Sequence, residues 1–204
     1  EVLSRRAQLE AAAALWLEGL PDGTDDFEKA KYIYDALILR TEYEQGSADS
    51  QTICSVLLNQ RSVCQGYAKT FQYLCQLAGI PAMLVTGDVN GEGHAWNIVF
   101  LDGDWYYIDP TWGDASYQRE EGEETPTLTE TVNYDYFCVT TQEIERTHSM
   151  DDNQLLPVCN AVQDQYYRHE GLYLLSADKV NIYEIFVFLS HNGVPLFCFH
   201  CSND

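Results

Sequence analysis

Residues 61–68 read Arg-Ser-Val-Cys-Gln-Gly-Tyr-Ala, which predicts the start of a helix with Cys64 in its first turn. Ser62 is a suitable N-cap, and Gln65 follows three residues later, as a capping box requires. The first N–H groups of a helix have no partner within the helix, and the helix dipole favours negative charge there. A thiolate is such a charge, so this position favours the nucleophilic form of Cys64.

The helix that begins here is expected to continue to about residue 78, because apolar residues recur at i, i+4 and i+7. Gly79 then provides a C-terminal stop, and Pro81 prevents continuation. Taken alone, Cys64 would more often be a small buried residue beneath a helix start than a catalytic one. The apolar face comprises Cys64, Ala68, Phe71, Cys75 and Ala78, widened by Tyr67, Leu74 and Leu77.

The chain before this helix is predicted to be almost entirely helical, whereas the chain after Pro81 changes to strand patterns. Helices are expected at residues 4–18, 26–41 and 50–59. A buried strand is expected at 83–85, a turn-rich loop at 87–93, and two further strands at 94–100 and 105–109. Between the last two strands, Asp102-Gly103 is a strong hairpin signal. Helices followed by an antiparallel sheet define an α+β fold.

The rest of the chain gives weaker patterns. Residues 113–131 are predicted to be a long acidic surface loop, and 134–139, 141–147 and 151–163 a strand, a short helix and an irregular segment. Residues 166–175 suggest a hairpin or an extended segment, 178–190 a helix or a strand, and 194–200 a final strand. We predict one domain over 1–204, with a core at about 25–114, a loop-rich extension at 115–164 and a C-terminal extension at 165–204.

Charge and composition exclude several classes of protein. Asp and Glu number 32 against 11 Lys and Arg, a formal net charge of −21, whereas nucleic acid binding needs a basic footprint. No run of 18 apolar residues is present, so membrane insertion is not expected. The seven cysteines are an odd number, so at least one cannot pair within the chain. Any disulfide is expected among Cys138, Cys159, Cys198 and Cys201, with Cys64 free.

Two polar residues combine with Cys64. If Asp102-Gly103 is a two-residue turn, Trp96 lies opposite Asp109, and His94 lies diagonally from Asp109 on the same face. Diagonal neighbours are about 7–8 Å apart at the backbone, within reach of long side chains. Asp109 can then accept the imidazole N–H and leave the other ring nitrogen of His94 for a thiolate. This is the nucleophile, base and orienting residue of acyl transfer.

The chain resembles the transglutaminase-like superfamily over about residues 25–114. Four segments carry the resemblance: Val-Cys-Gln-Gly-Tyr-Ala-Lys at 63–69, Leu-Ala-Gly-Ile-Pro at 77–81, Gly-His-Ala-Trp-Asn at 93–97 and Trp-Tyr-Tyr-Ile-Asp-Pro-Thr-Trp at 105–112. The resemblance implies a papain-like α+β core with the cysteine at the head of a helix packed on an antiparallel sheet. It assigns the nucleophile to Cys64, the base to His94 and the orienting role to Asp109.

The resemblance also indicates the expected substrate, because it implies a thioester route on protein or peptide amides. We expect no cofactor and no metal. Animal members of the superfamily use calcium, but calcium is not assumed here because no EF-hand loop is present. A second oxyanion donor besides the Cys64 backbone N–H is expected, with Gln51 favoured over Gln60. Tyr67, Trp96 and Trp112 are expected to line the cleft, with burial in the core as the alternative.

Three functions remain open from the sequence. The favoured one is a transglutaminase-like acyl transfer on glutamine-type amides. A hydrolytic cysteine peptidase or amidase with the same three residues is the second, and a catalytically silent module that binds peptides or glycans is the third. The acidic surface favours basic or neutral substrates. Because the chain begins at Glu1, a removed leader would be one explanation, consistent with an extracellular or cell-surface bacterial protein; a cytoplasmic location and any oligomeric state stay open.

Overall fold

The computed structural model describes residues 2–20, 22–46, 49–114, 132–174, 182, 183, 187, 200 and 201. The chain divides into two compact units, Glu1–Ala161 and Val162–Asp204, and each is described by itself. The first unit contains the N-terminal helices, the main sheet and all the residues discussed above as a candidate site. Among the described helices, none has both the length and the apolar composition that crossing a bilayer requires.

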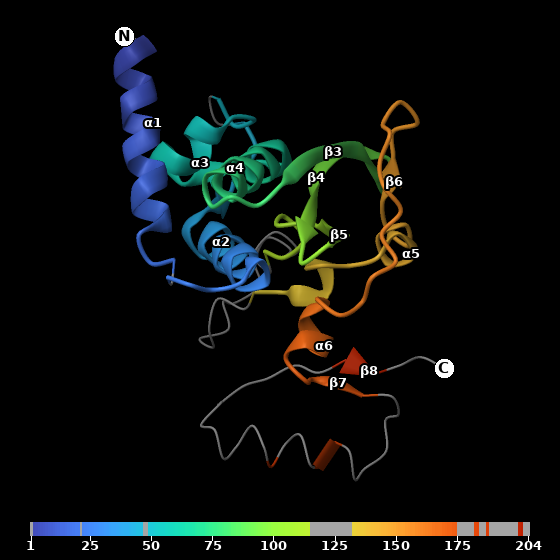
Figure 1. The fold of residues 1–204 in the computed structure, drawn as a ribbon. Helices are drawn as coiled ribbons and strands as arrows, with labels where there is room; N and C mark the ends of the chain where they lie inside the picture. Colours follow the sequence, from blue (N-terminus) through green and yellow to red (C-terminus); the bar gives the residue numbers. More distant parts are fainter. Residues whose placement is uncertain are drawn as a thin grey trace. The chain divides into compact units, whose positions relative to one another are not determined.

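Four helices precede the sheet of the first unit, which confirms the helical prediction for this part of the chain (Figure 1). Asp25 caps α2, because its side chain accepts a hydrogen bond from the backbone N–H of Glu28 at 2.9 Å. The helices are α1 (Val2–Leu17), α2 (Asp26–Arg40), α3 (Ile53–Asn59) and α4 (Cys64–Leu77).

The start of α4 differs from the prediction by one residue. Val63 is the N-cap, with no side-chain cap bond, so Cys64 is the first helical residue. Ser62 instead belongs to the short strand β2 (Arg61–Ser62), which pairs in parallel with β1 (Glu42–Tyr43). Its hydroxyl donates to the Ser50 carbonyl at 2.6 Å. The side chain that could have capped the helix therefore ties its first turn to the preceding loop.

The main sheet has the strand order β5-β4-β3-β6, and all its pairs are antiparallel. The hairpin at Asp102-Gly103 has the predicted register, since Leu101 pairs with Asp104 and Asn97 pairs with Ile108. The strands are β3 (Ala82–Val89), β4 (Glu92–Leu101), β5 (Asp104–Ile108) and β6 (Ser149–Met150). The α+β prediction is thus confirmed, with the cysteine at the head of α4.

The loop predicted at residues 87–93 is wrong. β3 continues to Val89 and β4 starts at Glu92, so only Asn90 and Gly91 form the turn. Both have positive φ, 54° and 87°, which is the requirement of a type I′ hairpin turn. The Asn-Gly pair carried this signal in the sequence, and the surrounding glycines obscured it.

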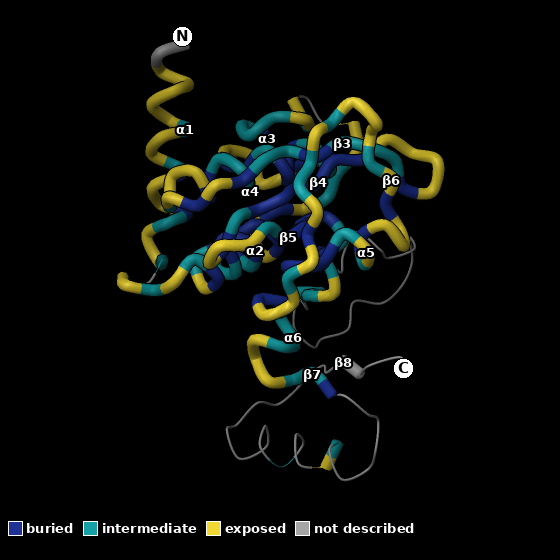
Figure 2. Tube along the Cα trace, turned by 45° about the vertical axis from the view of Figure 1, so that its right-hand side comes forward, coloured by how far each residue is buried: buried dark blue, intermediate teal, exposed yellow. Residues whose placement is uncertain are grey.

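The sheet has a buried layer on each face, and Figure 2 shows the buried segments running through α4, β4 and β5. Helix α4 packs on one face, where Asn97 Nδ2 donates to the Ala68 carbonyl at 3.0 Å. The opposite face is covered by the chain that follows β5. Its cluster comprises Val85, Trp96, Ile98, Tyr107, Val139, Ile144 and Cys159.

The segment that covers this second face is only partly as predicted. The expected strand at 134–139 is wrong, because Tyr134–Tyr136 form a 3₁₀ turn (η1) and only Val139 pairs, with Tyr107. The predicted short helix is α5 (Thr141–Ile144), fixed by a capping box between Thr140 and Glu143. The edge strand β6 was not predicted.

The second unit holds α6 (Tyr166–His169) and a parallel pair formed by β7 (Tyr173–Leu174) and β8 (His200–Cys201). The hairpin suggested for 166–175 is therefore a helical turn followed by a strand. Most of residues 178–199 and of the acidic loop, from 115 to 131, lie outside the described residues.

Candidate active site

His94 and Asp109 meet as the hairpin register predicts. His94 opens the buried part of β4 and Asp109 directly follows β5, and His94 Nε2 lies 2.7 Å from Asp109 Oδ2. Both residues are buried, Asp109 completely. Because one ring nitrogen of His94 is taken by the carboxylate, Nδ1 is the nitrogen that remains for the thiol.

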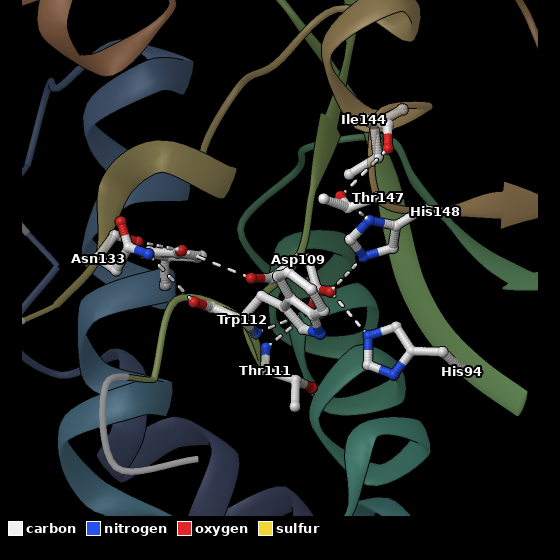
Figure 3. A network of polar contacts seen from close by, with 9 residues as sticks. His94, Asp109, Thr111, Trp112, Asn133, Ile144, Thr147 and His148 are labelled. Atoms are coloured by element: carbon white, nitrogen blue, oxygen red, sulfur yellow. Dashed lines mark hydrogen bonds and ion pairs between the residues drawn. The ribbon is translucent and has the colours of Figure 1, made fainter. Parts of the chain in front are cut away.

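Asp109 is held by four hydrogen bonds. Its Oδ1 accepts from the backbone N–H groups of Thr111 at 2.9 Å and Trp112 at 3.2 Å, and its Oδ2 is approached by two histidines, as Figure 3 shows. Burial alone would raise the pKa of Asp109, but the hydrogen bonds from His148 and His94 lower it to about 2. Asp109 is therefore a carboxylate across the physiological range and can only accept hydrogen bonds.

The pKa of His94 is shifted in the complementary direction. Burial favours the neutral ring, but hydrogen bonds to Asp109 and Cys64 outweigh it and raise the pKa of His94 to about 10. Cys64 is thus one of the groups that act on the His94 ring, and Asp109, which is hydrogen-bonded to Nε2, is the other.

Cys64 is a free, half-buried thiol at the first position of α4. The prediction that it takes part in no disulfide is confirmed. Cys54, Cys75 and Cys159 are free thiols as well, so Cys159 leaves the set of residues expected to contain a disulfide. Cys198 and the side chain of Cys201 lie outside the described residues.

His148 is part of this group, and the sequence analysis missed it. Its Nε2 lies 2.9 Å from Asp109 Oδ2 and its Nδ1 lies 2.7 Å from Thr147 Oγ1. It directly precedes β6, whose pairing with Gly87 and Asp88 on β3 brings it to the site. No local pattern marks a histidine between two polar residues. Only the pairing of the two-residue strand β6 would have indicated it.

The three buried side chains of His94, Asp109 and His148 could also be considered as metal ligands. However, Nε2 of His94 and Nε2 of His148 lie at hydrogen-bonding distances of 2.7 and 2.9 Å from the same oxygen, Oδ2 of Asp109. Ligand atoms around a tetrahedral zinc ion with bonds near 2.05 Å would be about 3.3 Å apart. The arrangement is that of two N–H donors on one acceptor, without room for an ion between them.

The other predicted site residues lie in different surroundings. Gln51 is exposed, and its backbone carbonyl accepts from Lys69 Nζ at 3.0 Å. Tyr67 is completely buried, and its hydroxyl contacts the Thr41 carbonyl and Asp114 Oδ2 at 2.8 and 2.9 Å. Tyr67 thus packs in the core, which was the alternative considered from the sequence.

The two tryptophans border the histidines. Trp96 is fully buried, and its ring lies 5.8 Å from that of His94, stacked at 22°. Trp112 is half-buried and lies 5.1 Å from the ring of His148. Of the two, Trp112 has the partial exposure expected of a cleft-lining residue, whereas Trp96 packs in the core, the alternative considered from the sequence.

The fold and this group of side chains define a class of papain-like α+β proteins with a cysteine at a helix start and a histidine on the adjacent sheet. The model of the transglutaminase-like superfamily matches residues 17–110, a segment that contains Cys64, His94 and Asp109. Over this segment, which is just under half of the chain, the sequence is similar to the transglutaminase-like superfamily.

Curated relatives support the same assignment. The kyphoscoliosis peptidase of Homo sapiens is 33% identical over 113 residues, which cover 47% of this chain and 17% of that protein. The Mus musculus protein is 32% identical over the same shares. The chain therefore spans less than a fifth of these relatives.

Solved structures show partial similarity. The crystal structure of a TGase is 19% identical, with a TM-score of 0.46, over 63% of this chain and 36% of that one. A cysteine-protease candidate from Cytophaga hutchinsonii is 24% identical, with a TM-score of 0.43, over 50% and 37%. Both TM-scores are below 0.5, so the similarity to this family rests on the sequence matches alone.

Proposed function

We propose that the first unit is a thiol-dependent acyltransferase that acts on protein or peptide amides of the glutamine type. One observation carries the proposal: His94 is held by Asp109 through Nε2 at 2.7 Å, and Cys64 also acts on the same imidazole. A nucleophile, a base and a residue that orients the base are the components of a covalent acyl-transfer mechanism.

In the first half-reaction, the Cys64 thiolate attacks the amide carbonyl carbon. The backbone N–H at the start of α4 is placed to stabilise the resulting oxyanion, because it has no partner within the helix. Gln51 remains our proposal for a second donor. The His94 imidazolium then gives its proton to the leaving nitrogen, the C–N bond breaks, and a thioester on Cys64 remains.

In the second half-reaction, an amine attacks the thioester carbonyl and neutral His94 takes its proton. The C–S bond breaks, the new amide leaves, and the thiolate–imidazolium pair is restored when the proton is retained on His94. Throughout, Asp109 stays ionised and keeps the ring oriented. The acidic character of the chain would favour basic or neutral substrates over acidic ones.

Hydrolysis is the second candidate, because the curated relatives are named peptidases. The same thioester would then be attacked by water in place of an amine. A silent binding module is the third candidate, and it would need neither an activated thiol nor its histidine. Reactivity of Cys64 therefore separates the third candidate from the other two.

The first prediction concerns alkylation of Cys64 by iodoacetamide at pH 6. An ordinary thiol with a pKa near 8.5 is less than about 1% ionised there, whereas a thiolate beside an imidazolium reacts much faster. We expect Cys64 to react at least about tenfold faster than Cys54. His94→Ala should slow the reaction strongly, and Asp109→Asn should have an intermediate effect. Peptide mass mapping of one sample measures both cysteines.

Cys54 is a matched control because it is also a free, half-buried thiol and also lies beside a cation, Arg5. Equal labelling of both cysteines, unaffected by His94→Ala, would move the binding module to first place. If Cys64 is fast, a glutamine peptide incubated with and without a primary amine separates the remaining candidates. Incorporation of the amine indicates transfer, and deamidation or cleavage alone indicates hydrolysis. Cys64→Ser should abolish each product.

A further inference from the structure

We propose that His148 is a positioning residue of this site, which holds Asp109 Oδ2 in place for its contact with His94. The proposal rests on the proposed function, because it assigns His148 a role in supporting His94. Figure 3 shows the two imidazoles approaching the same carboxylate from different elements, with Thr147 behind His148.

The hydrogen atoms of this group follow from the charge of Asp109. The carboxylate is ionised and can only accept, so Nε2 of His94 and Nε2 of His148 must both carry hydrogen. In its neutral form His94 then has its lone pair on Nδ1, where it can take a proton from Cys64. His148 uses its own Nδ1 on Thr147, so it has no nitrogen left for a substrate or a thiol.

The ring of His148 is fixed by packing as well as by hydrogen bonds. It is 1% exposed, and its centroid lies 4.9 Å from Trp96, 5.1 Å from Trp112 and 5.8 Å from Tyr136. A polar ring enclosed by three aromatic rings is costly to bury unless its nitrogens are satisfied. Here both nitrogens are satisfied, and the ring lies beside the Asp109 carboxylate and the ring of His94, whose centroid is 5.5 Å away.

The main chain is also built to bring His148 to this place. Gly87 on β3 pairs with Met150 on β6, and a Cβ at Gly87 would collide with the Ser149 carbonyl and approach Trp96 to 2.8 Å. Glycine therefore permits the close approach of the strand that follows His148. The result is that the orienting carboxylate has two amides on Oδ1 and two imidazoles on Oδ2.

This arrangement has a mechanical consequence for His94. Two backbone amides hold Oδ1 of Asp109, but they do not fix where Oδ2 points. If His94 were the sole donor to Oδ2, the carboxylate would be oriented by the same ring that it has to orient. A second donor on Oδ2 removes this freedom. Loss of His148 would leave one buried lone pair of the carboxylate without its donor and let Oδ2 turn away from His94.

The test compares a substitution that keeps an N–H donor with one that keeps a ring. His148→Gln keeps an N–H donor at about the reach of Nε2, whereas His148→Phe keeps the ring and removes the donor. His148 borders a hollow of about 550 Å³ that is also lined by residues such as Tyr107, Met150 and Leu156. A small side chain at position 148 would leave space that solvent from this hollow could fill, so both replacements are large. The readout is the rate of Cys64 alkylation against pH, in the full chain, with Cys54 as internal reference.

We expect His148→Phe to slow alkylation at pH 6 about tenfold, the scale of a lost hydrogen bond to a charged group. The slowing should be largest at acid pH, where an unassisted thiol reacts least, because the imidazolium loses support. His148→Gln should stay within about threefold of the parent. In an Asp109→Asn background, His148→Phe should have little further effect, since the two residues act through one contact.

The proposal is overturned if the folded His148→Gln and His148→Phe variants show the same alkylation rate of Cys64 at each pH. It is also overturned if His148→Phe slows alkylation as much in the Asp109→Asn background as it does alone. If His148→Phe does not fold, Thr147→Val replaces it: Thr147 is exposed, and loss of its hydroxyl should give a smaller shift in the same direction, whereas no shift overturns the proposal. A slower wild-type rate after chelator treatment would assign His148 to a metal instead. If Cys64 of the wild type reacts no faster than Cys54, the proposed function is refuted. The outcomes above refute only the positioning role of His148.

Discussion

At the scale of single residues, Asp109 is the centre of the candidate site. A buried carboxylate is unfavourable unless charge and hydrogen bonds compensate it, and here four donors do so. The same contacts that stabilise the carboxylate orient His94 towards Cys64. Stability and chemistry are therefore coupled through one side chain.

This coupling predicts a pH dependence of stability. The pKa of His94 is about 10 in the folded protein, against 6.5 for the ordinary side chain. A raised pKa gives stability that is fully present below pH 6.5 and is lost as the pH rises to about 10. For Asp109, with a pKa of about 2 against 3.8, the contribution is present above pH 4 and lost as the pH falls to about 2.

We expect the Tm difference between wild type and His94→Gln to be largest between about pH 4 and 6.5. It should be about 5 °C there, from a charge-assisted hydrogen bond in a chain of this size, and should narrow as the pH rises to 10. Scanning calorimetry over this range measures it. The control is His169→Gln, at a partly exposed histidine of the second unit; its Tm difference from wild type should not narrow as the pH rises. A Tm difference for His94→Gln that widens above pH 6.5 contradicts the assignment.

At the scale of elements, the site lies where three of them meet: the start of α4, the β4–β5 hairpin and the edge strand β6. The hairpins fix the strand ends, and each depends on a two-residue turn with positive φ, at Asn90-Gly91 and at Asp102-Gly103. A slip of one residue in β4 would turn His94 to the opposite face. The turns therefore set the position of the catalytic candidates.

The β3–β4 turn gives a prediction with a matched control. Gly91 has φ of 87° and open space where a Cβ would lie, whereas Gly93 has the same open space and an ordinary backbone conformation. Gly91→Ala should lower stability by about 1 kcal/mol, the cost of a left-handed conformation for a residue with a Cβ. Gly93→Ala should be neutral or slightly stabilising. Urea denaturation of both variants measures the difference, and equal losses would mean that backbone strain is not the cause.

The elements also show which parts of the fold a sequence can predict. The register of β4 with β5 followed from Asp102-Gly103 and from alternation, and it led directly to the His94–Asp109 contact. The exact cap of α4 could not be obtained, because Ser62 is drawn aside by Ser50, twelve residues earlier. His148 escaped for a related reason: its contact with Asp109 spans 39 residues and depends on a strand of two residues.

At the scale of the whole molecule, the dominant feature is charge. Carboxylates exceed cationic side chains by 21, so most of them cannot form ion pairs within the chain. The ion pairs among described residues such as Arg5–Asp49 and Arg6–Glu10 involve exposed side chains, which contribute little to stability. Repulsion between unpaired carboxylates should therefore outweigh the exposed pairs.

This balance predicts that salt stabilises the protein. Raising NaCl from about 20 mM to 300 mM shortens the screening length several-fold and reduces the self-repulsion that opposes the compact state, so the Tm at pH 7 should rise by a few degrees. The same titration near the sequence pI of about 4.3 is the control, because the net charge is then close to zero and the rise should disappear. Measured at pH 7, a Tm that falls with salt would show that the ion pairs dominate after all. The buried contacts of Asp109 are little screened, so the alkylation advantage of Cys64 over Cys54 should persist through the same salt range even as the global stability changes.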